Sequence, residues 1–234
     1  MEASDLAALE SSPFEADLPP AVRRAMAATG TGRDVTRHQR LFHQGDPASH
    51  LWFVASGRVK LTQVGADGQE VVVRFVGPGE IFAGVALLPG ASYPVNAEVV
   101  EAGRLLTWPH AVVARLAAEH PQLALKTTAT IAARMSELQH RFRELATERV
   151  HQRIARALLR LARQAGRRTD EGVLIDHRLS RQDLAEMTGT TLFTVSRVLS
   201  RWEAEGILAV GRERVVVRDP HRLVAVAEDL GATS

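Results

Sequence analysis

The sequence predicts an α+β protein in which a β-roll is followed by a long helix and a mainly helical C-terminal domain. Three observations support this order. Short β-branched runs separated by turn residues fill residues 36–108, an apolar 3-4 repeat follows at residues 128–145, and two helical segments flank Gly189. Such runs predict strands, whereas a 3-4 repeat predicts a helix. At 234 residues the chain is long enough for two separate cores.

The composition restricts the chemistry that the chain can perform. It contains no cysteine, which excludes disulfides, thiolate zinc sites and iron–sulfur clusters. With neither a signal peptide nor a long apolar run, we expect a cytoplasmic protein with no membrane partner. The net charge is only +2, but Arg outnumbers the acidic residues between positions 148 and 218. We therefore expect polyanion binding to be local to that region.

Residues 36–120 are expected to form the roll. The strand candidates are residues 51–54, 59–62, 70–76, 97–100 and 104–107, with turns at Gly45-Asp46, Gly57, Ala66-Asp67-Gly68 and Gly77-Pro78-Gly79. Several short strands at this spacing predict a compact roll or barrel. Before it, residues 1–35 form a lead-in of short helices or irregular chain, because Pro13 and Pro19-Pro20 interrupt an Ala-rich stretch.

A long helix is predicted over residues 121–147, after a shorter one bounded by Pro109 and Pro121. Its apolar side chains form a heptad seam made of Thr128, Ile131, Met135, Leu138, Phe142 and Leu145. A seam of this kind is typical of a two-stranded coiled coil, so we expect a parallel homodimer. The alternative is that this face packs on the chain's own roll, and one long helix can do both.

Residues 180–202 predict a helix-turn-helix. Ser180 and Asp183 have the spacing of a capping box, Gly189 suits a left-handed turn, and Thr191 caps the second helix. The inner face of that second helix consists of Val195, Val198, Leu199 and Trp202. Its outer face carries hydroxyls and arginines but no acid, which suits a helix lying in a DNA major groove. The alternative is an ordinary helical hairpin within a globular core.

The DNA-binding domain is expected to span residues 148–221, with a C-terminal tail at residues 222–234. An Arg-rich helical stretch at residues 148–168, whose helix ends at Gly166, opens it, and residues 207–217 form a basic hairpin, or wing, after Gly206. The wing arginines are placed to reach phosphates. The candidate DNA-binding residues are Ser180, Arg181, Gln182, Thr190, Thr191, Phe193, Thr194, Ser196, Arg197, Arg201, Arg212 and Arg214.

Two sets of motifs resemble the Crp/Fnr superfamily of transcription regulators, over residues of about 36–220. In the roll these are Gln44-Gly45-Asp46, the run Leu-Trp-Phe-Val-Ala-Ser-Gly at residues 51–57, and Gly77-Pro78-Gly79-Glu80. In the C-terminal domain they are residues 179–189 and Thr194-Val195-Ser196-Arg197. The resemblance implies a cyclic-nucleotide-binding-like roll that senses an effector, a winged helix-turn-helix, a homodimer on palindromic double-stranded DNA, and RNA polymerase as a partner.

Departures from the family pattern bear on the effector. Where the family's cyclic-nucleotide pocket has a Glu for the ribose and an Arg for the phosphate, this sequence has Gly84 and Val95. A buried phosphate without a cationic partner is costly, so we do not expect cyclic AMP to bind in the family's manner. Residues 82–85 also lack the histidine of the carbon-monoxide-sensing branch. Residues 187–197 and Tyr93-Pro94-Val95 resemble the nitrogen-oxide-responsive Dnr/NnrR branch, which implies haem as a candidate cofactor.

No haem ligand can be named from the sequence. The chain has nine histidines, of which His38, His43 and His50 fall in the roll and His110, His120, His140 and His151 flank or lie in the long helices. A lone histidine is far more often a surface or hydrogen-bonded residue than an axial ligand. The aromatic residues at positions 52, 53, 75, 82 and 108 are likewise more typical of a roll core than of a cofactor site.

Two functions of other classes compete with a sequence-specific regulator. One is an architectural protein that binds DNA with weak sequence preference, and the other is an enzyme controlled by its roll. The sequence offers no nucleophile–base–acid group, Gly-rich phosphate loop or metal cluster, so we expect no catalytic or metal site. Arg197, on the outer face and suited to bidentate contact with guanine, favours the sequence-specific reader.

Overall fold

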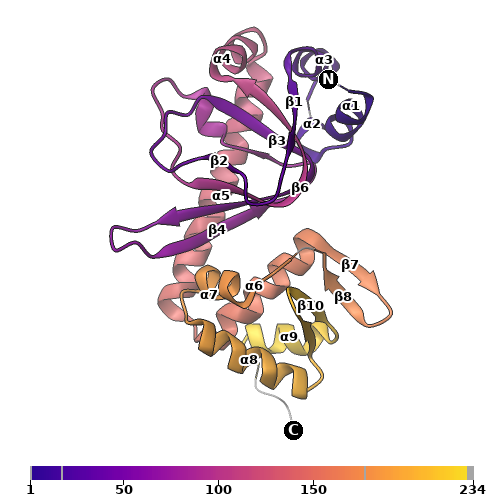
Figure 1. The fold of residues 1–234 in the computed structure, drawn as a ribbon, viewed down its shortest axis with the longest axis vertical. Helices are drawn as coiled ribbons and strands as arrows, with labels where there is room; N and C mark the ends of the chain where they lie inside the picture. The colour runs from indigo at the N-terminus through magenta and orange to yellow at the C-terminus, as the bar shows by residue number, and fades with distance from the viewer. Residues whose placement is uncertain (1, 17, 177, 231–234) are drawn as a thin grey trace. The chain divides into compact units, whose positions relative to one another are not determined.

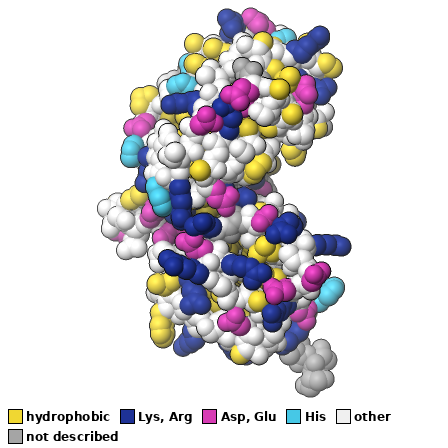
Figure 2. Space-filling view, turned by 45° about the vertical axis from the view of Figure 1, so that its right-hand side comes forward, with side chains coloured by type: hydrophobic (Ala, Val, Ile, Leu, Met, Phe, Trp, Pro, Cys, Tyr) yellow, Lys and Arg dark blue, Asp and Glu magenta, His cyan; other side chains and the backbone are white. Residues whose placement is uncertain are grey.

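The computed structural model describes residues 2–16, 18–176 and 178–230 (Figure 1). The chain divides into two compact units, Met1–Glu137 and Leu138–Ser234, and helix α5 (Pro121–Thr147) contributes residues to both. On the face drawn in Figure 2, charged side chains of both signs are interspersed over each unit. None of the helices in these described ranges is both long enough and apolar enough to cross a membrane.

An antiparallel sheet forms the centre of the first unit, which confirms the α+β roll. Its strand order is β1-β6-β3-β4, with β2 paired to β6 and β5 paired to β3. The strands are β1 (Thr31–Val35), β2 (Arg40–Phe42), β3 (His50–Val64), β4 (Glu70–Val76), β5 (Ile81–Phe82) and β6 (Asn96–Pro109). The sheet therefore begins before residue 36, because β1 pairs with β6 from Thr31 to Val35.

Strands β3 and β6 are longer than the sequence predicts. The runs at residues 51–54 and 59–62 join into β3, and those at residues 97–100 and 104–107 join into β6. Gly57 is the reason, because its φ of 81° forms an irregularity in the pairing of β3 with β6 instead of a chain-reversing turn. The backbone oxygen of Glu101 would lie 2.6 Å from a Cβ at Gly57, so only glycine fits this bulge.

The two faces of the sheet carry separate cores, because successive residues of a strand point to opposite sides. Trp52 and Val54 face one core, together with Phe42, Phe82 and Tyr93. The other core consists of Leu9, Phe14, Leu18, Val22, Met26, Leu51, Phe53, Ile81, Leu106, Trp108, Val113, Leu116 and Leu123. The aromatic residues at positions 52, 53, 75, 82 and 108 are all buried, as predicted for a roll core.

The N-terminal lead-in folds as short helices, the first of the two expected alternatives. Helices α1 (Ala3–Glu10), α2 (Pro13–Ala16) and α3 (Pro20–Thr29) supply Leu9, Phe14, Val22 and Met26 to the second core. The indole Nε1 of Trp108 donates to the carbonyl oxygen of Met26 over 2.9 Å. The lead-in is thus an integral part of the first unit.

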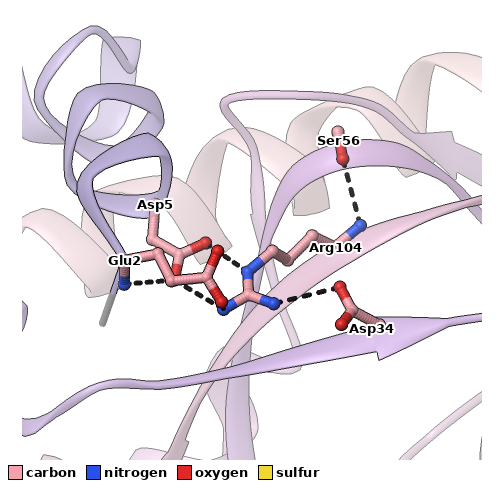
Figure 3. A network of polar contacts seen from close by, with 5 residues as sticks. All are labelled: Glu2, Asp5, Asp34, Ser56 and Arg104. Atoms are coloured by element: carbon pink, nitrogen blue, oxygen red, sulfur yellow. Dashed lines mark hydrogen bonds and ion pairs between the residues drawn. The ribbon is translucent and has the colours of Figure 1, made fainter.

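A buried ion pair fastens α1 to strand β6 (Figure 3). The Nε of Arg104 donates to Oδ1 of Asp5 over 2.6 Å, and Nη2 donates to Oδ2 over 3.1 Å. The same guanidinium contacts Asp34 at 3.0 Å and Glu2 at 2.7 Å. The Asp5 side chain is 1% exposed. The hydrogen bond from Arg104 holds the pKa of Asp5 below its usual value although burial acts the other way, so Asp5 stays ionised.

Two further helices complete the first unit. The 3-10 helix η1 (Gly84–Leu87) follows β5, and α4 (His110–Glu119) follows β6 and precedes α5. Leu123 and Thr127 of α5 are buried, whereas its side chains from Thr128 onward are mostly exposed. The start of α5 therefore packs on the roll, and the rest of the helix leaves one apolar face open.

The second unit combines helices with a small antiparallel sheet in the order β7-β8-β10-β9. Its helices are α6 (Val150–Ala165), α7 (Arg181–Thr188), α8 (Leu192–Ala204) and α9 (Pro220–Ala227). Its strands are β7 (Gly166–Thr169), β8 (Gly172–Ile175), β9 (Leu208–Gly211) and β10 (Arg214–Val217). The wing is β9 and β10, as predicted.

The sequence prediction misses two features of this unit. The Arg-rich helix ends at Ala165 with Gly166 as its C-cap, as predicted, but residues from Gly166 to Thr169 pair with β8 as strand β7, which the sequence did not predict. Part of the expected tail is helix α9, whose Leu223 and Ala227 are buried. Its N-cap, Asp219, accepts a hydrogen bond from the backbone of Arg222 at 3.0 Å, which stabilises the start of the helix.

Candidate nucleic-acid interface

The helix-turn-helix consists of α7 and α8, with the local geometry that the sequence predicts. Ser180 Oγ accepts from the backbone N–H of Asp183 at 3.0 Å, and Asp183 Oδ2 accepts from that of Ser180 at 3.1 Å. This reciprocal capping box starts α7. Gly189 ends it in the left-handed conformation, with φ of 59°. Thr191 then caps α8 by accepting from the N–H of Thr194.

Arg153 of α6 donates hydrogen bonds to the turn between α7 and α8. Its Nε donates to the carbonyl of Thr188 over 2.9 Å, and its Nη2 donates to that of Gly189 over 3.4 Å. Its Nη1 donates to the carbonyl of Glu148 over 2.8 Å. These carbonyls have no partner within the helix end, so the guanidinium caps them. The sequence gives no sign that singles out Arg153 from the other arginines of its helix, and it was therefore missed.

Leu145, near the end of α5, lies against the same turn. A Cβ added at Gly189 would come within 2.9 Å of its Cδ2 atom. Contact at this range requires the leucine side chain to shift. Gly189 is therefore required for its left-handed backbone, whereas the end of the flexible leucine side chain could give way to a β-carbon.

Helix α8 buries one face and exposes the other, as its spacing predicts. Val195, Leu199 and Trp202 are buried against the rest of the unit, and Val198 is half-buried. Of the predicted outward residues, Thr191, Phe193, Arg197, Ser200 and Arg201 are exposed, whereas Thr190, Thr194 and Ser196 are half-buried. The helix thus keeps one side available for a ligand.

Several of these outward side chains already have partners within the chain. The hydroxyl oxygens of Thr191 and Thr194 lie 3.0 Å apart. Arg201 donates to Glu205 over 2.8 Å, and Gln182 of α7 donates to Glu186 over 2.8 Å. Among the residues that the structure describes, Arg197 has no hydrogen bond or ion pair of its side chain, and the ring of Phe193 is 73% exposed.

The arginines in and near the wing also differ in whether they form ion pairs within the chain. Arg214 pairs with Glu171 of the β7–β8 turn at 3.0 Å, and Arg178 pairs with Glu213 at 3.3 Å. Arg212 is exposed, with no ion pair to any described residue. On α6, Arg156 and Arg160 pair with Glu148 and Glu144. Many of the arginines in this region therefore hold the unit together, whereas Arg181, Arg197 and Arg212 have no side-chain partner within the part of the chain that the structure describes.

Gly84 and Val95 are the two roll positions at which the sequence departs from the cyclic-nucleotide pocket of the family that it resembles. Gly84 begins η1, and a Cβ there would lie 3.2 Å from Cγ2 of Thr127 and 3.7 Å from Cδ1 of Ile131, both on α5. A longer acidic side chain at Gly84 would therefore meet α5. Val95 packs against the core of the roll and offers no positive charge. A phosphate at this place would have no partner at either position.

Three of the described histidines have separate local contacts. His38 lies 3.3 Å from Glu98, His50 lies 2.9 Å from the hydroxyl of Ser49, and His110 bonds the carbonyl of Ala86. Burial, and secondarily Arg33, lower the pKa of His50. Within residues 2–16, 18–176 and 178–230, no group of three His, Cys, Asp or Glu could hold a metal ion.

The predicted seam of α5 is uncovered in the single chain. Ile131, Met135, Leu138, Phe142 and Leu145 are between 41% and 75% exposed, and Thr128 is also exposed. Ile131 contacts the roll near Gly84, so part of this face packs on the chain's own roll, and pairing with a second copy stays a prediction. An apolar stripe of this length on one helix face marks an interaction surface.

Known proteins match both units of the chain. Residues 33–120 match the family described as cyclic nucleotide-binding domain, and residues 152–226 match the Crp-like helix-turn-helix domain. The chain is 33% identical over 187 residues to the Cyclic AMP receptor protein of Thermus thermophilus, covering 80% of this chain and 83% of that one. It is 30% identical over 198 residues to the nitrogen fixation regulation protein FixK of Azorhizobium caulinodans, covering 84% and 79%.

A solved structure gives the same result for the fold. FixK2 from Bradyrhizobium japonicum superposes with a TM-score of 0.75 at 25% sequence identity. The match covers 84% of this chain and 96% of that one. The roll, the long helix and the helix-turn-helix therefore occur in this order in a protein that shares a quarter of the aligned residues.

Proposed function

Because the chain belongs to the Crp/Fnr family of transcription regulators, we propose that it acts as a homodimer that reads a palindromic DNA site with helix α8. The relatives it matches are regulators, not enzymes. The observation that carries the proposal is the outer face of α8, where Phe193 is exposed and Arg197 has no side-chain partner among the described residues. Arg153 caps the turn that precedes this helix. Arg181 and Arg212 lie on neighbouring elements and supply contacts to phosphates.

The exposed seam of α5 supports the homodimer. Its six residues repeat at heptad spacing over residues 128–145, and pairing two copies in parallel would cover the stripe on both. A two-fold dimer reads two half-sites whose centres lie about one helical turn of DNA apart. In this proposal residues 36–120 sense the effector, residues 121–147 dimerise and residues 148–221 bind DNA. The structure extends the sensing part to include strand β1 and the DNA-binding part to include helix α9.

We propose that the effector is not cyclic AMP bound in the family's usual manner. The name of the relative from Thermus thermophilus includes cyclic AMP, but Gly84 and Val95 leave the ribose and the phosphate without partners in this chain. We place the protein in the nitrogen-oxide-responsive Dnr/NnrR-like branch on the resemblance of residues 187–197 and of Tyr93-Pro94-Val95. The described histidines do not form a ready haem site, so no haem ligand is assigned.

RNA polymerase is the proposed partner through which the bound regulator changes transcription. The competing function, an architectural protein with weak sequence preference, needs only an array of cations that contact phosphates. Arg197 argues against it, because an unpaired guanidinium on the groove-facing side of α8 is suited to bidentate contact with guanine. Effector identity is open to a direct test: if the protein binds haem, added haem will give the purified protein a visible absorption band, and nitric oxide will shift that band.

Selection of binding sites from random double-stranded DNA tests the proposal. We expect a two-fold symmetric site with half-site centres about 10 base pairs apart and at least roughly 1,000-fold preference over random competitor DNA. Arg197→Ala should erase the preference for a guanine and cost about 1–3 kcal/mol, whereas Arg212→Ala should weaken all sequences alike. Recovery of no enriched sequence, with random DNA competing equally well, would favour the architectural function.

A further inference from the structure

Helix α8 presents an apolar edge at the end that enters a DNA groove. Leu192 and Phe193 are its first two residues, and they are 48% and 73% exposed. Single exposed apolar residues are common, but two adjacent ones at a binding end form a patch that water does not solvate well. In helix-turn-helix proteins the N-terminal residues of this helix contact base edges. The patch therefore lies where base readout takes place.

Most polar side chains near Phe193 already have partners within the chain, so few of them are available to contact a base. The hydroxyls of Thr191 and Thr194 lie within hydrogen-bonding distance of each other in the helix cap, and Arg201 is paired with Glu205. Arg197 lies four residues after Phe193, so the two side chains share one helix face. They are separated by about 6 Å along the helix axis. With base steps of about 3.4 Å, they meet base pairs one or two steps apart.

Resting on the proposed function, we propose that Phe193 is a specificity-determining residue that reads the 5-methyl group of a thymine beside the guanine read by Arg197. A phenyl ring neither donates nor accepts a conventional hydrogen bond, so it cannot satisfy the amino or carbonyl groups of a base edge. Thymine is the one unmodified base that offers an apolar group in the major groove. The half-site is thus read by one charged and one apolar contact.

Replacing thymine by deoxyuridine in the duplex selected from random DNA removes only this methyl group. Covering one methyl is worth about 0.8 kcal/mol, or roughly four-fold in affinity, so uracil in both half-sites should weaken binding about ten- to twenty-fold. Phe193→Ala should bind the thymine and uracil duplexes equally. Phe193→Glu should instead select cytosine or adenine at this position, because a carboxylate accepts from their amino groups.

Matched controls separate the methyl contact from other effects. Leu192→Ala, at the adjacent exposed position, should keep the thymine-to-uracil difference, and Arg197→Ala should keep it while losing the guanine preference. Retention of the guanine preference by Phe193→Ala shows that the variant is folded. A palindrome that the unmodified protein binds equally with thymine or uracil at every position overturns this inference and leaves the proposed function standing. Failure to select any sequence overturns both.

Discussion

Asp5 is a charged side chain that is buried between helix α1 and strand β6 and nevertheless stays ionised. Its carboxylate receives two hydrogen bonds from Arg104, which also contacts Glu2 and Asp34. A buried charge is stable only when it is paired and hydrogen-bonded. The partners come from the N-terminal lead-in and from β6, so this cluster adds a polar attachment to the apolar contacts that already hold the lead-in on the roll.

We expect Asp5→Asn to lower the free energy of unfolding at pH 7. A carboxylate whose pKa is lowered by folding stabilises the protein above its unfolded pKa and loses that contribution as the pH falls through its folded pKa. The difference between Asp5→Asn and the unmodified protein should therefore be full at pH 7 and shrink as the pH falls below 3.8, the usual value for aspartate. Urea unfolding at a series of pH values measures it.

Glu2→Gln is the matched control for this prediction. Glu2 contacts the same guanidinium at 2.7 Å, but its side chain is 67% exposed. Exposed ion pairs contribute about 0–1 kcal/mol, so this variant should lie close to the unmodified protein. A difference for Asp5→Asn that stays constant down to pH 2 would show that the ionised carboxylate is not its source.

Individual residues could be predicted from the sequence where their partners are close in the chain. Ser180, Asp183, Gly189 and Thr191 were identified because caps and turns depend on spacings of three or four residues. Arg153, by contrast, bonds the carbonyl of Thr188 across the fold. An arginine on a helix has the same sequence appearance whether it faces solvent or caps another helix, so no local pattern could have found it.

Helices and strands, like single residues, could be predicted where the signals that define them are close together in the chain. The bounds of α5 agree with the predicted helix at residues 121–147, since proline marks its start and heptad spacing extends almost to its end. The hairpin of β7 and β8 was missed because its pairing partner β10 lies far along the chain. Gly57 was taken for a turn because a glycine at a bulge and one at a hairpin look alike in sequence.

The seam of α5 is tested by placing charges on it. We expect Ile131→Glu with Leu138→Glu to leave a monomer at micromolar concentration and to weaken DNA binding, because a parallel dimer would bury four carboxylates without partners. Sedimentation velocity measures the mass. Ala133→Glu with His140→Glu puts the same charges at the same spacing on exposed positions outside the seam and should leave the dimer intact.

A stable dimer of the seam variant would assign the stripe another role. Ile131 also approaches η1 near Gly84, so the roll of this variant must be shown to be folded by circular dichroism before its mass is interpreted. Leu138→Glu alone, at a position that is 46% exposed, provides the second variant. A monomer from Leu138→Glu with an unchanged spectrum identifies the seam as the dimer contact.

Considered as a whole molecule, the chain joins a roll that matches the cyclic nucleotide-binding domain to a unit that matches the Crp-like helix-turn-helix domain. The order of roll, helix and winged helix-turn-helix was predictable, because each part has its own period and turn residues. The effector was not predictable, because a pocket is built from residues that converge from separate strands. Gly84 and Val95 indicate which contacts are missing, but they do not identify a ligand.

Cyclic AMP at millimolar concentration is expected to leave the affinity for DNA unchanged and to give no calorimetric binding signal. The physical reason is that Gly84 and Val95 provide neither an acceptor for the ribose nor a cation for the phosphate. The relative from Thermus thermophilus that is named for cyclic AMP serves as a positive control in the same titration. A micromolar dissociation constant would mean that other residues of the roll have replaced both anchors.

The contact between Leu145 and Gly189 also constrains how this protein can evolve. A β-carbon at position 189 would need a left-handed backbone and, at the same time, room that Leu145 now occupies. Because the left-handed backbone strains any other side chain whatever the room, position 189 should stay glycine even in a lineage whose residue 145 becomes smaller. The end of the leucine side chain can shift, so the turn places little demand on residue 145. Descent should therefore preserve the glycine of the turn, while residue 145 is selected mainly by what the seam of α5 contacts.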